Sequence, residues 1–129
     1  MGRSTIPDSM SFRVCVYQLP DEPGVFIAHC LDLDLMGEGD KVESALEELL
    51  EVIDSQIETC QRTGANFWFH APASVWKTYS EARKAGRKIA GELVERVMDR
   101  ANKRLGHHIL ELENIVASEE IPEEFLALA

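Results

Sequence analysis

Alternation of apolar and polar residues predicts two short β-strands near the start of the chain. Between residues 12 and 19, Phe12, Val14 and Val16 are apolar and the positions between them are more polar. Successive side chains of a strand point to opposite faces, so this pattern is typical of a strand buried on one side. The turn-rich run 20–24 separates it from the β-prone residues 25–30. We therefore expect a β-hairpin over 12–30.

The run Leu-Asp-Leu-Asp at 31–34 is either a loop anchored by its leucines or the start of a third short strand over 35–39. A long amphipathic helix follows, at about 41–63. Asp40 and Glu43 have the spacing of a capping box, and Gly64 is a natural stop. The apolar positions recur at intervals of three and four residues, which lines one helix face; they are Val42, Ala45, Leu46, Leu49, Leu50, Ile53, Ile57 and Cys60.

The second half of the chain is more irregular. Phe-Trp-Phe at 67–69 predicts a fourth strand over 65–70, and residues 73–105 have a helical composition. The apolar positions of 73–105 form two stripes on different sides of one helical wheel. The helix therefore either breaks near Gly86 or Gly91 or is clasped from two sides, as in a dimer.

A last short strand is expected around 109–112, followed by an acidic tail over 117–129. Together these elements predict an α+β fold: an antiparallel three- or four-stranded sheet with one long amphipathic helix packed on it, plus a C-terminal helical extension. Within a single domain, we expect a leader over 1–11, a core over 12–72, and the extension with its acidic tail over 73–129.

Length and composition narrow the class of protein. The chain has 129 residues, 45% of them hydrophobic, and contains no apolar run of the roughly 18 residues that a membrane helix needs. The first eleven residues lack the apolar stretch of a secretory signal, so we expect a cytoplasmic protein without membrane contact. The three cysteines at 15, 30 and 60 are too far apart to indicate a metal knuckle, and we expect reduced, mostly buried thiols.

Charge is distributed unevenly. The net charge is −10, which argues against non-specific nucleic-acid binding by the whole surface, yet residues 81–104 hold eight of the 13 basic side chains. These cations either contact phosphates or neutralise the acidic helix and tail, and we favour neutralisation. The candidate nucleic-acid contacts are Arg83, Lys84, Arg87, Lys88, Arg96 and Arg100.

Aromatic residues gather between positions 67 and 79. On an alternating strand Trp68 faces away from its neighbours, so one face of that strand needs a covering partner. We therefore expect a homodimer or higher oligomer. The candidate partner or dimer surface consists of Phe67, Trp68, Phe69 and Trp76.

Arrangements that support catalysis or metal binding are weak. His29 and Cys30 point to opposite faces of a strand, which leaves Asp32 and Asp34 as only two ligands on one face. The glycines of Gly-Glu-Gly-Asp at 37–40 lie beside carboxylates that repel phosphate, and the adjacent histidines at 107 and 108 chelate poorly. We expect no cofactor, no metal and no enzymatic activity, with a nuclease-like role for the two aspartates as a minor alternative.

Three motifs occur in the order of a known family. They are Val-Phe-Ile-Ala-His-Cys-Leu-Asp-Leu-Asp at 25–34, Gly-Glu-Gly-Asp at 37–40 and Glu-Ser-Ala-Leu at 43–46. Over about residues 12–63, the chain resembles the HicB-like antitoxins. Where that family usually has Pro-Asp-Leu-Pro-Gly, this chain has Leu-Asp-Leu-Asp.

The resemblance implies a small sheet with one helix, described for that family as a degraded ribonuclease H-like fold. It also implies a non-catalytic protein that oligomerises and covers the active site of a small basic toxin-like ribonuclease, or a solitary relative without a toxin. Many members of the family also carry a DNA-binding segment. The alternative function is therefore a nucleic-acid-binding regulator that acts through the basic helix 81–105.

Overall fold

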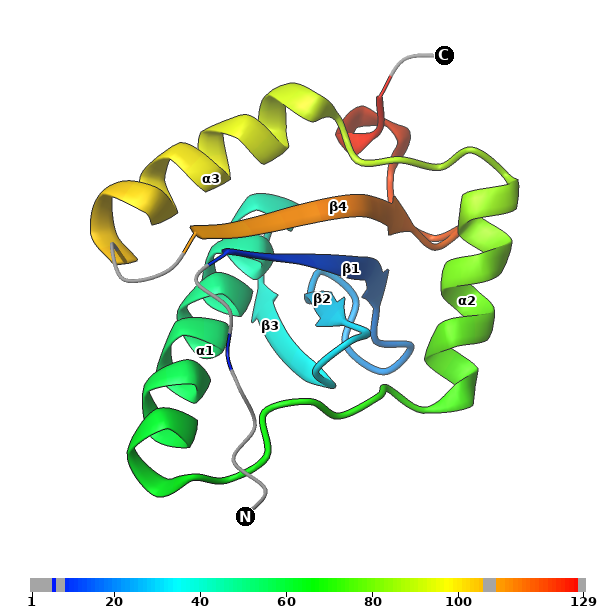
Figure 1. Ribbon diagram of the computed structural model, residues 1–129. Coiled ribbons are helices and arrows are strands. Elements are labelled where there is room, and N and C mark those ends of the chain that lie inside the picture. Colours follow the sequence, from blue (N-terminus) through cyan, green and yellow to red (C-terminus); the bar gives the residue numbers. More distant parts are fainter. Residues whose placement is uncertain (1–5, 7–8, 106–108, 128–129) are drawn as a thin grey trace.

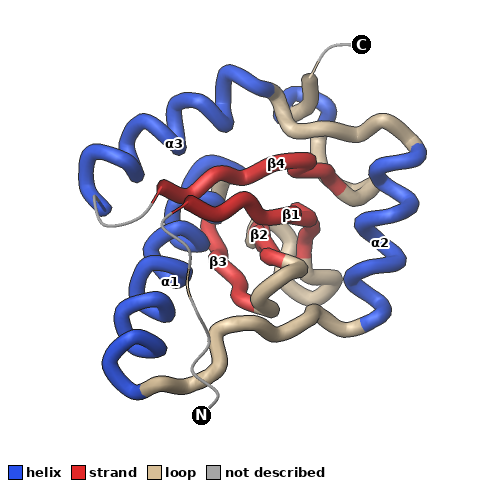
Figure 2. Tube along the Cα trace, in the orientation of Figure 1, coloured by secondary structure: helices blue, strands red, loops and turns tan. Residues whose placement is uncertain are grey.

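The computed structural model describes residue 6 and residues 9–105 and 109–127. Figures 1 and 2 show a twisted sheet with helices on both sides. Its β1 begins at Ser9, so the expected leader is too long, and the His107-His108 pair lies outside the described residues. The elements within the described ranges are β1 (Ser9–Gln18), β2 (Phe26–Cys30), β3 (Leu35–Gly39), α1 (Val42–Thr63), α2 (Ala73–Lys84), α3 (Gly91–Leu105), β4 (Ile109–Ala117) and a 3-10 turn, Glu123–Phe125.

The sheet is mixed, with the strand order β3-β2-β1-β4. β1 is antiparallel to β2, and β2 to β3, whereas β4 runs parallel to β1. The α+β class is confirmed, but the prediction of a purely antiparallel sheet is wrong. A parallel partner needs a long crossover, and the chain from β2 through α3 provides it.

The fourth strand is β4 and not the predicted segment 65–70, which has no strand pairing. β1 already has a neighbour on each side, so its edges offer no place to another strand. Helices do form within 73–105, but the chain does not end as a helical extension, because β4 returns to the sheet beside β1.

One face of the sheet packs against α1 and α3. The apolar side of β1 meets the predicted apolar stripe of α1, and Leu93, Val97 and Ala101 of α3 complete the same core. Phe12, Val14 and Val16 are each at most 1% exposed. Burial of this many apolar side chains is the main favourable term for folding. The hairpin and the amphipathic helix are thus confirmed.

α1 lies directly on β3. An added methyl group at Gly37 would meet the backbone of Leu49 and Ala45 well inside van der Waals contact, and one at Gly39 would meet Ser44. The two glycines of Gly-Glu-Gly-Asp therefore let helix and strand backbones approach, as a residue without Cβ allows.

The start of α1 differs from the predicted capping box. The N-cap is Lys41 rather than Asp40. Ser44 Oγ accepts a bond from the Lys41 N–H at 3.1 Å and donates to the Asp40 carboxylate at 3.2 Å. Ser44 thus takes the role expected of Glu43, whose carboxylate instead points to α3. Gly64, at φ 75°, ends the helix as predicted.

The other face of the sheet packs against α2. Tyr79 and Ala82 of α2 meet Cys15, Leu31 and Val116 in a second, smaller cluster. The helical segment breaks between Lys84 and Gly91, and Gly86 has φ 70° at the break. The helical segment thus breaks near Gly86, which confirms the first of the two predicted alternatives.

The acidic tail is part of the fold. The Ala90 N–H donates to the Phe125 carbonyl at 2.9 Å, so the tail lies beside the linker between α2 and α3. Ile121 is 1% exposed, and the Phe125 ring lies 5.5 Å from that of Phe26. Among the described residues, no helix is both long and apolar enough to cross a bilayer.

We expect Gly37→Ala to lower the free energy of unfolding by at least about 3 kcal/mol, because the new methyl group meets rigid helix backbone. The matched control is Gly91→Ala, where an added methyl group meets nothing within 4 Å. That variant should stay within about 1 kcal/mol of the parent. Urea unfolding measures both; equal stability of the two variants would contradict the close approach of α1 to β3.

Candidate protein-interaction surface

Residues 64–72 connect α1 to α2 and pass the end of the sheet (Figure 1). We call this segment the aromatic loop. It changes sides on the way, since Phe67 lies in the α1-side core and Ala71 in the α2-side cluster. The Ala71 N–H donates to the Leu31 carbonyl at 3.0 Å, and the Asn66 side chain bonds both backbone groups of Trp68. The loop is therefore held at both ends.

The predicted aromatic surface is divided by this crossing. Phe67 is 1% exposed, so it is a core residue and leaves the predicted surface. Trp68 and Phe69 are 39% and 52% exposed. The ring centroid of Trp68 lies 5.0 Å from that of Phe67, in an edge-on arrangement, and 6.4 Å from that of Phe12. One side of its indole thus rests on the core, while the rest of the ring and Phe69 face solvent. We call Trp68 and Phe69 the aromatic loop pair.

Trp76 lies beyond the aromatic loop pair, at the first turns of α2. Its indole is half-buried, and the Arg13 guanidinium carbon lies 4.7 Å from its centre, a cation–π distance. Arg13 also donates to Asp32 Oδ1 at 2.7 Å, and its backbone N–H donates to Asp32 Oδ2 at 2.9 Å. These contacts hold the Trp76 ring in place.

His29 is buried between two polar partners. Its Nε2 lies 2.7 Å from Asp34 Oδ1, and its Nδ1 lies 2.9 Å from the Tyr17 hydroxyl. A carboxylate cannot donate, so the Nε2–H donates to Asp34, and a second hydrogen bond joins Nδ1 to the Tyr17 hydroxyl. Burial raises the pKa of Tyr17 and keeps the phenol protonated. Asp34 has φ 53°, a left-handed conformation that turns its carboxylate to the histidine.

These contacts use the residues considered for a metal site. Asp32 is bound by Arg13, Asp34 by His29, and Cys30 points into the α1-side core. Among the described residues there is no group of three or more His, Cys, Asp or Glu that could hold a metal ion. The Leu-Asp-Leu-Asp run instead anchors the turn after β2, with Leu31 and Leu33 buried on opposite sides.

The buried thiols are poor nucleophiles. Burial raises the pKa of Cys15 to about 12, and the nearby Glu120 carboxylate adds to the shift. Burial also raises the pKa of Cys30 to about 12, although the backbone groups of Leu33 and Asp32 oppose it. A thiol with so high a pKa carries almost no thiolate near neutral pH, and the thiolate is the reactive form.

Three arginines of α3 face the acidic side of α1. Arg96 and Arg100 reach Glu43 at 3.6 and 3.5 Å, Arg100 also pairs with Glu47, and Arg104 lies 3.0 Å from Glu51. The acidic and basic partners each repeat every four residues, so the two helices present matching rows of charge. We call this arrangement the α1–α3 charge ladder; it is the neutralisation that the sequence favoured for Arg96 and Arg100.

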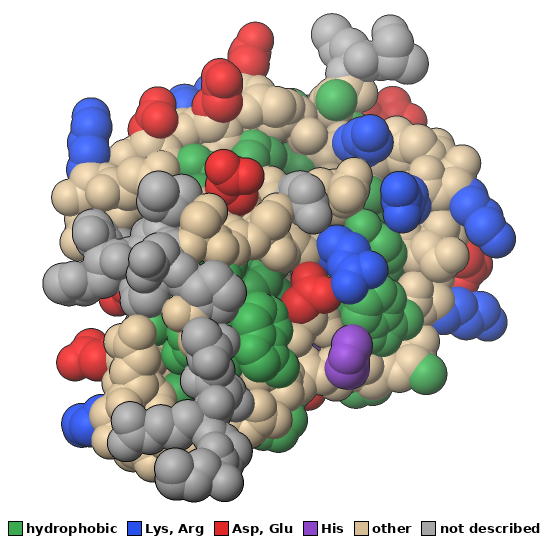
Figure 3. All heavy atoms as spheres, viewed as in Figure 1, with side chains coloured by type: hydrophobic (Ala, Val, Ile, Leu, Met, Phe, Trp, Pro, Cys, Tyr) green, Lys and Arg blue, Asp and Glu red, His purple; other side chains and the backbone are tan. Residues whose placement is uncertain are grey.

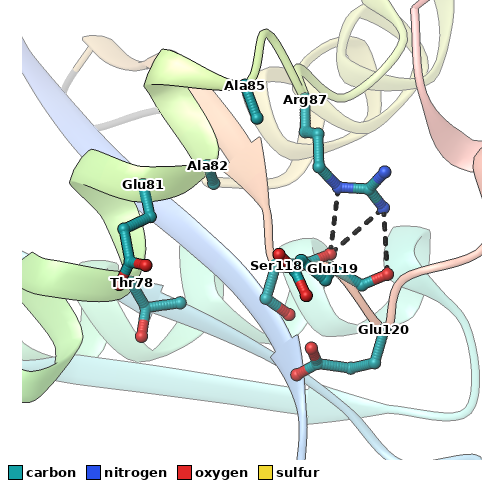
Figure 4. A pocket seen from close by; sticks show the side chains of 8 residues that line it. All are labelled: Thr78, Glu81, Ala82, Ala85, Arg87, Ser118, Glu119 and Glu120. Carbon is teal, nitrogen blue, oxygen red and sulfur yellow. Dashed lines mark hydrogen bonds between the residues drawn. The ribbon is translucent and has the colours of Figure 1, made fainter.

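The cations nearer α2 are placed differently. Arg87 donates to a cluster of backbone carbonyls, those of Ala117, Ser118 and Ile121 among them, and so closes the turn after β4. Arg83, Lys84 and Lys88 are exposed. In Figure 3 basic side chains gather on the side of the molecule where α2 lies. Arg96 and Arg100 are exposed as well but pair with carboxylates of α1, so Arg83, Lys84 and Lys88 are the predicted nucleic-acid contacts outside the α1–α3 charge ladder and the Arg87 cluster shown in Figure 4.

Comparisons with protein-family models, curated proteins and solved structures found no match to this chain. Sequence reasoning missed the contacts of Arg13 and Tyr17, which alternate with the apolar residues of β1. This alternation was the signal that could have predicted them, because buried polar side chains on a strand require hydrogen-bond partners.

We expect the two high-pKa thiols to make stability depend on alkaline pH. A thiol whose pKa rises on folding contributes stability below the ordinary value of 9.0, and that contribution is lost as pH rises from 9 toward about 12. In urea unfolding at pH 7, 9 and 10.5, the parent should lose more stability than Cys15→Ala/Cys30→Ala. Equal alkaline losses would show that both thiols ionise as freely in the folded protein as in the unfolded chain.

We expect Arg100→Glu to lower the free energy of unfolding by about 1 kcal/mol, because the new carboxylate faces Glu43 and Glu47. The matched double variant, Arg100→Glu with Glu47→Arg, should recover most of the loss. Thermal and urea unfolding measure both variants at low salt. If the double variant is no more stable than the single one, the α1–α3 charge ladder contributes nothing.

Proposed function

We propose that this chain is a non-catalytic protein-binding module of the HicB-like antitoxin kind, or a solitary relative of one, and that the aromatic loop pair is its main contact. The partner class is a small basic protein of the toxin-like ribonuclease type. The single observation that carries the proposal is the placement of Trp68 and Phe69, two adjacent large aromatic side chains at 39% and 52% exposure.

Exposed aromatic neighbours on a fixed loop are what protein interfaces use. Trp and Tyr dominate binding hot spots, because a rigid ring buries much area at little entropic cost. The loop is held by hydrogen bonds at Asn66 and Ala71, and Trp68 rests on Phe12 and Phe67. Little conformational entropy then remains to be lost when a partner binds.

The absence of catalysis is argued from the partners of each reactive group. A catalytic site needs a nucleophile, a base and a stabiliser that are mutually placed and accessible. His29 is 3% exposed with both ring nitrogens in hydrogen bonds, and the Cys15 and Cys30 thiols are held neutral. Asp32 holds Arg13. The reactive groups within the HicB-like segment thus have structural roles.

Each motif of the HicB-like resemblance also has a physical role that suits a rigid binding scaffold. The Leu-Asp-Leu-Asp run anchors the turn next to the aromatic loop through Leu31 and Asp32. Gly37 and Gly39 seat α1 on β3. The net charge of −10 suits a basic partner, since opposite charges raise association rates.

We also propose that copies of the chain associate through the same aromatic loop pair when no partner is bound. The alternative, a nucleic-acid regulator acting through 81–105, has weaker support. Arg96 and Arg100 contact carboxylates of α1, and Arg87 contacts backbone carbonyls. Arg83, Lys84, Lys88 and Lys103 then remain for phosphates, few enough that the surrounding negative charge outweighs them.

We test the proposal by searching the adjacent reading frames for a small basic protein and co-expressing such a protein with the chain. The parent should co-purify with that protein and suppress its toxicity. Trp68→Ser/Phe69→Ser should lose at least about 100-fold in affinity, because two aromatic anchors are removed. The matched control is Met36→Ser, which removes another exposed apolar side chain, 50% exposed, from the edge strand. It should bind as the parent does.

Circular dichroism confirms that each variant is folded, and sedimentation reports the state of the free chain. If Met36→Ser loses as much affinity as Trp68→Ser/Phe69→Ser, or if the latter variant binds as the parent does, the aromatic loop pair is not the main contact. A single species near 14.5 kDa at micromolar concentration would exclude self-association. Micromolar duplex DNA or RNA binding that weakens strongly from 50 to 200 mM salt and vanishes on reversal of Arg83, Lys84 and Lys88 would favour the regulator instead.

A further inference from the structure

A chain of hydrogen bonds connects the buried His29 to the surface on the side of the sheet that carries α2. His29 is 3% exposed, and Met36, its cross-strand neighbour on β3, is 50% exposed. The Tyr17 hydroxyl lies between them, 2.9 Å from His29 Nδ1 and 3.7 Å from Met36 Sδ. On the other side of the ring, His29 Nε2 lies 2.7 Å from Asp34 Oδ1. We call these four side chains the His29 relay.

The Tyr17 hydroxyl has one proton and two acceptors within reach. When His29 Nδ1 carries no proton, it accepts a hydrogen bond from the hydroxyl. When Nδ1 carries a proton, it donates to the hydroxyl oxygen instead, and the hydroxyl proton is free to turn to the Met36 sulfur, a weak acceptor. Every polar group of the His29 relay therefore keeps a hydrogen-bond partner in both charge states of the ring. This matters because a buried polar group without a partner is costly.

The surroundings of His29 also provide for the charge of an imidazolium. The Asp34 side chain is 38% exposed, and its carboxylate accepts the Nε2–H in either charge state of the ring. Cys15, the neighbour of His29 on β1, stays neutral because burial raises the pKa of its thiol to about 12. An imidazolium at His29 therefore has its counter-ion at hydrogen-bond distance. The other ionisable groups on this side of the sheet, from the elements packed around the ring, are the Arg13–Asp32 ion pair, Glu38 of β3, Tyr79 of α2 and Glu120 of the turn after β4.

We propose that His29 takes up and releases a proton inside the folded protein, and that the Tyr17 hydroxyl turns from Nδ1 to Met36 Sδ when the proton binds. The hydroxyl turns about its own C–O bond, so the exchange needs no movement of the backbone. Proton uptake makes Asp34 the counter-ion of a buried cation and gives the Met36 sulfur a hydrogen bond. The His29 relay is thus a pH-sensitive switch with two exposed ends. It is separate from the aromatic loop pair and does not rest on the proposed function.

NMR of the unaltered chain between pH 8.5 and 5.5 tests the switch, because histidine ordinarily changes charge in this range. Long-range ¹H–¹⁵N spectra distinguish a neutral imidazole from an imidazolium. We expect His29 to pass from the first to the second while the backbone amide spectrum stays that of the folded protein. The Met36 methyl resonance should shift with the same midpoint, whereas that of Met98, which packs against the core from α3, should not. A His29 ring in one charge state throughout, or a Met36 methyl that does not follow it, would overturn the proposal.

Variants separate the relay from general electrostatics. Asp34→Asn keeps an acceptor for the Nε2–H and tolerates the left-handed backbone at φ 53°, but it removes the charge. The midpoint of His29 should therefore fall by about one pH unit. The matched control, Glu38→Gln, removes an exposed carboxylate that does not contact the ring and should move the midpoint by less than about 0.3 unit.

Tyr17→Phe removes the hydroxyl that joins the two ends of the relay. The Met36 methyl should then no longer shift with the titration of His29, although the distance between the two side chains is unchanged. A methyl that still follows His29 in this variant would show a direct effect of the charge instead of a turning hydroxyl. That result, or a midpoint in Asp34→Asn equal to that of the parent, would overturn the proposal.

Discussion

The contact of α1 with β3 is the constraint on which the rest of the structure depends. Gly37 and Gly39 allow helix backbone to rest directly on strand backbone. This closeness gives the α1 stripe its position over β1 and β2, where residues such as Leu46 and Leu49 are fully buried. The acidic side of α1 then faces α3, where Arg96 pairs with Glu43 and Arg100 with Glu47. The same helix ends at Gly64, from which the aromatic loop passes the end of the sheet.

The second organising feature is the turn that follows β2. Leu31 and Leu33 reach into the two clusters on opposite faces of the sheet, and Asp32 and Asp34 hold Arg13 and His29. A sequence of alternating leucine and aspartate thus ties both layers to the sheet and neutralises the polar side of β1. These carboxylates therefore serve the scaffold, and the loop that carries the exposed Trp68 and Phe69 is hydrogen-bonded to the same turn, from the Ala71 N–H to the Leu31 carbonyl.

Local patterns predicted the elements that depend on local chemistry. The hairpin follows from alternation and α1 from its three-and-four spacing, whereas the helix break between Lys84 and Gly91 follows from two stripes that no single helix can bury. The direction of β4 was missed, because its parallel pairing with β1 is a long-range contact that leaves no signal in the nine residues of the strand itself. Phe67 was assigned to a strand on β-propensity, but tertiary packing prevails here: its ring enters the core from an irregular loop.

The candidate sites likewise divide into features that local sequence patterns predicted and features that depend on long-range contacts. The cluster of aromatic residues placed Trp68 and Phe69 on the predicted surface, but on a strand that would have turned them to opposite faces. The pairing of Arg96 and Arg100 followed from the separation of charges along the chain. The approach of α2 to the turn after β4 was not predictable, since these two segments are brought together only by the parallel crossover. Arg87 illustrates the limit best: its charge was visible in the sequence, but its carbonyl partners lie 30 or more residues away.

The central claim is that the aromatic loop, rather than the basic helices, meets the partner. Hydrogen–deuterium exchange on a complex with a small basic partner protein tests it most directly, because it maps contacts on an unaltered chain. The account predicts that the backbone amides of residues 66–70 and the start of α2 gain protection, while those of α3 exchange as in the free chain. Protection confined to residues 83–104, with an unchanged aromatic loop, would contradict it.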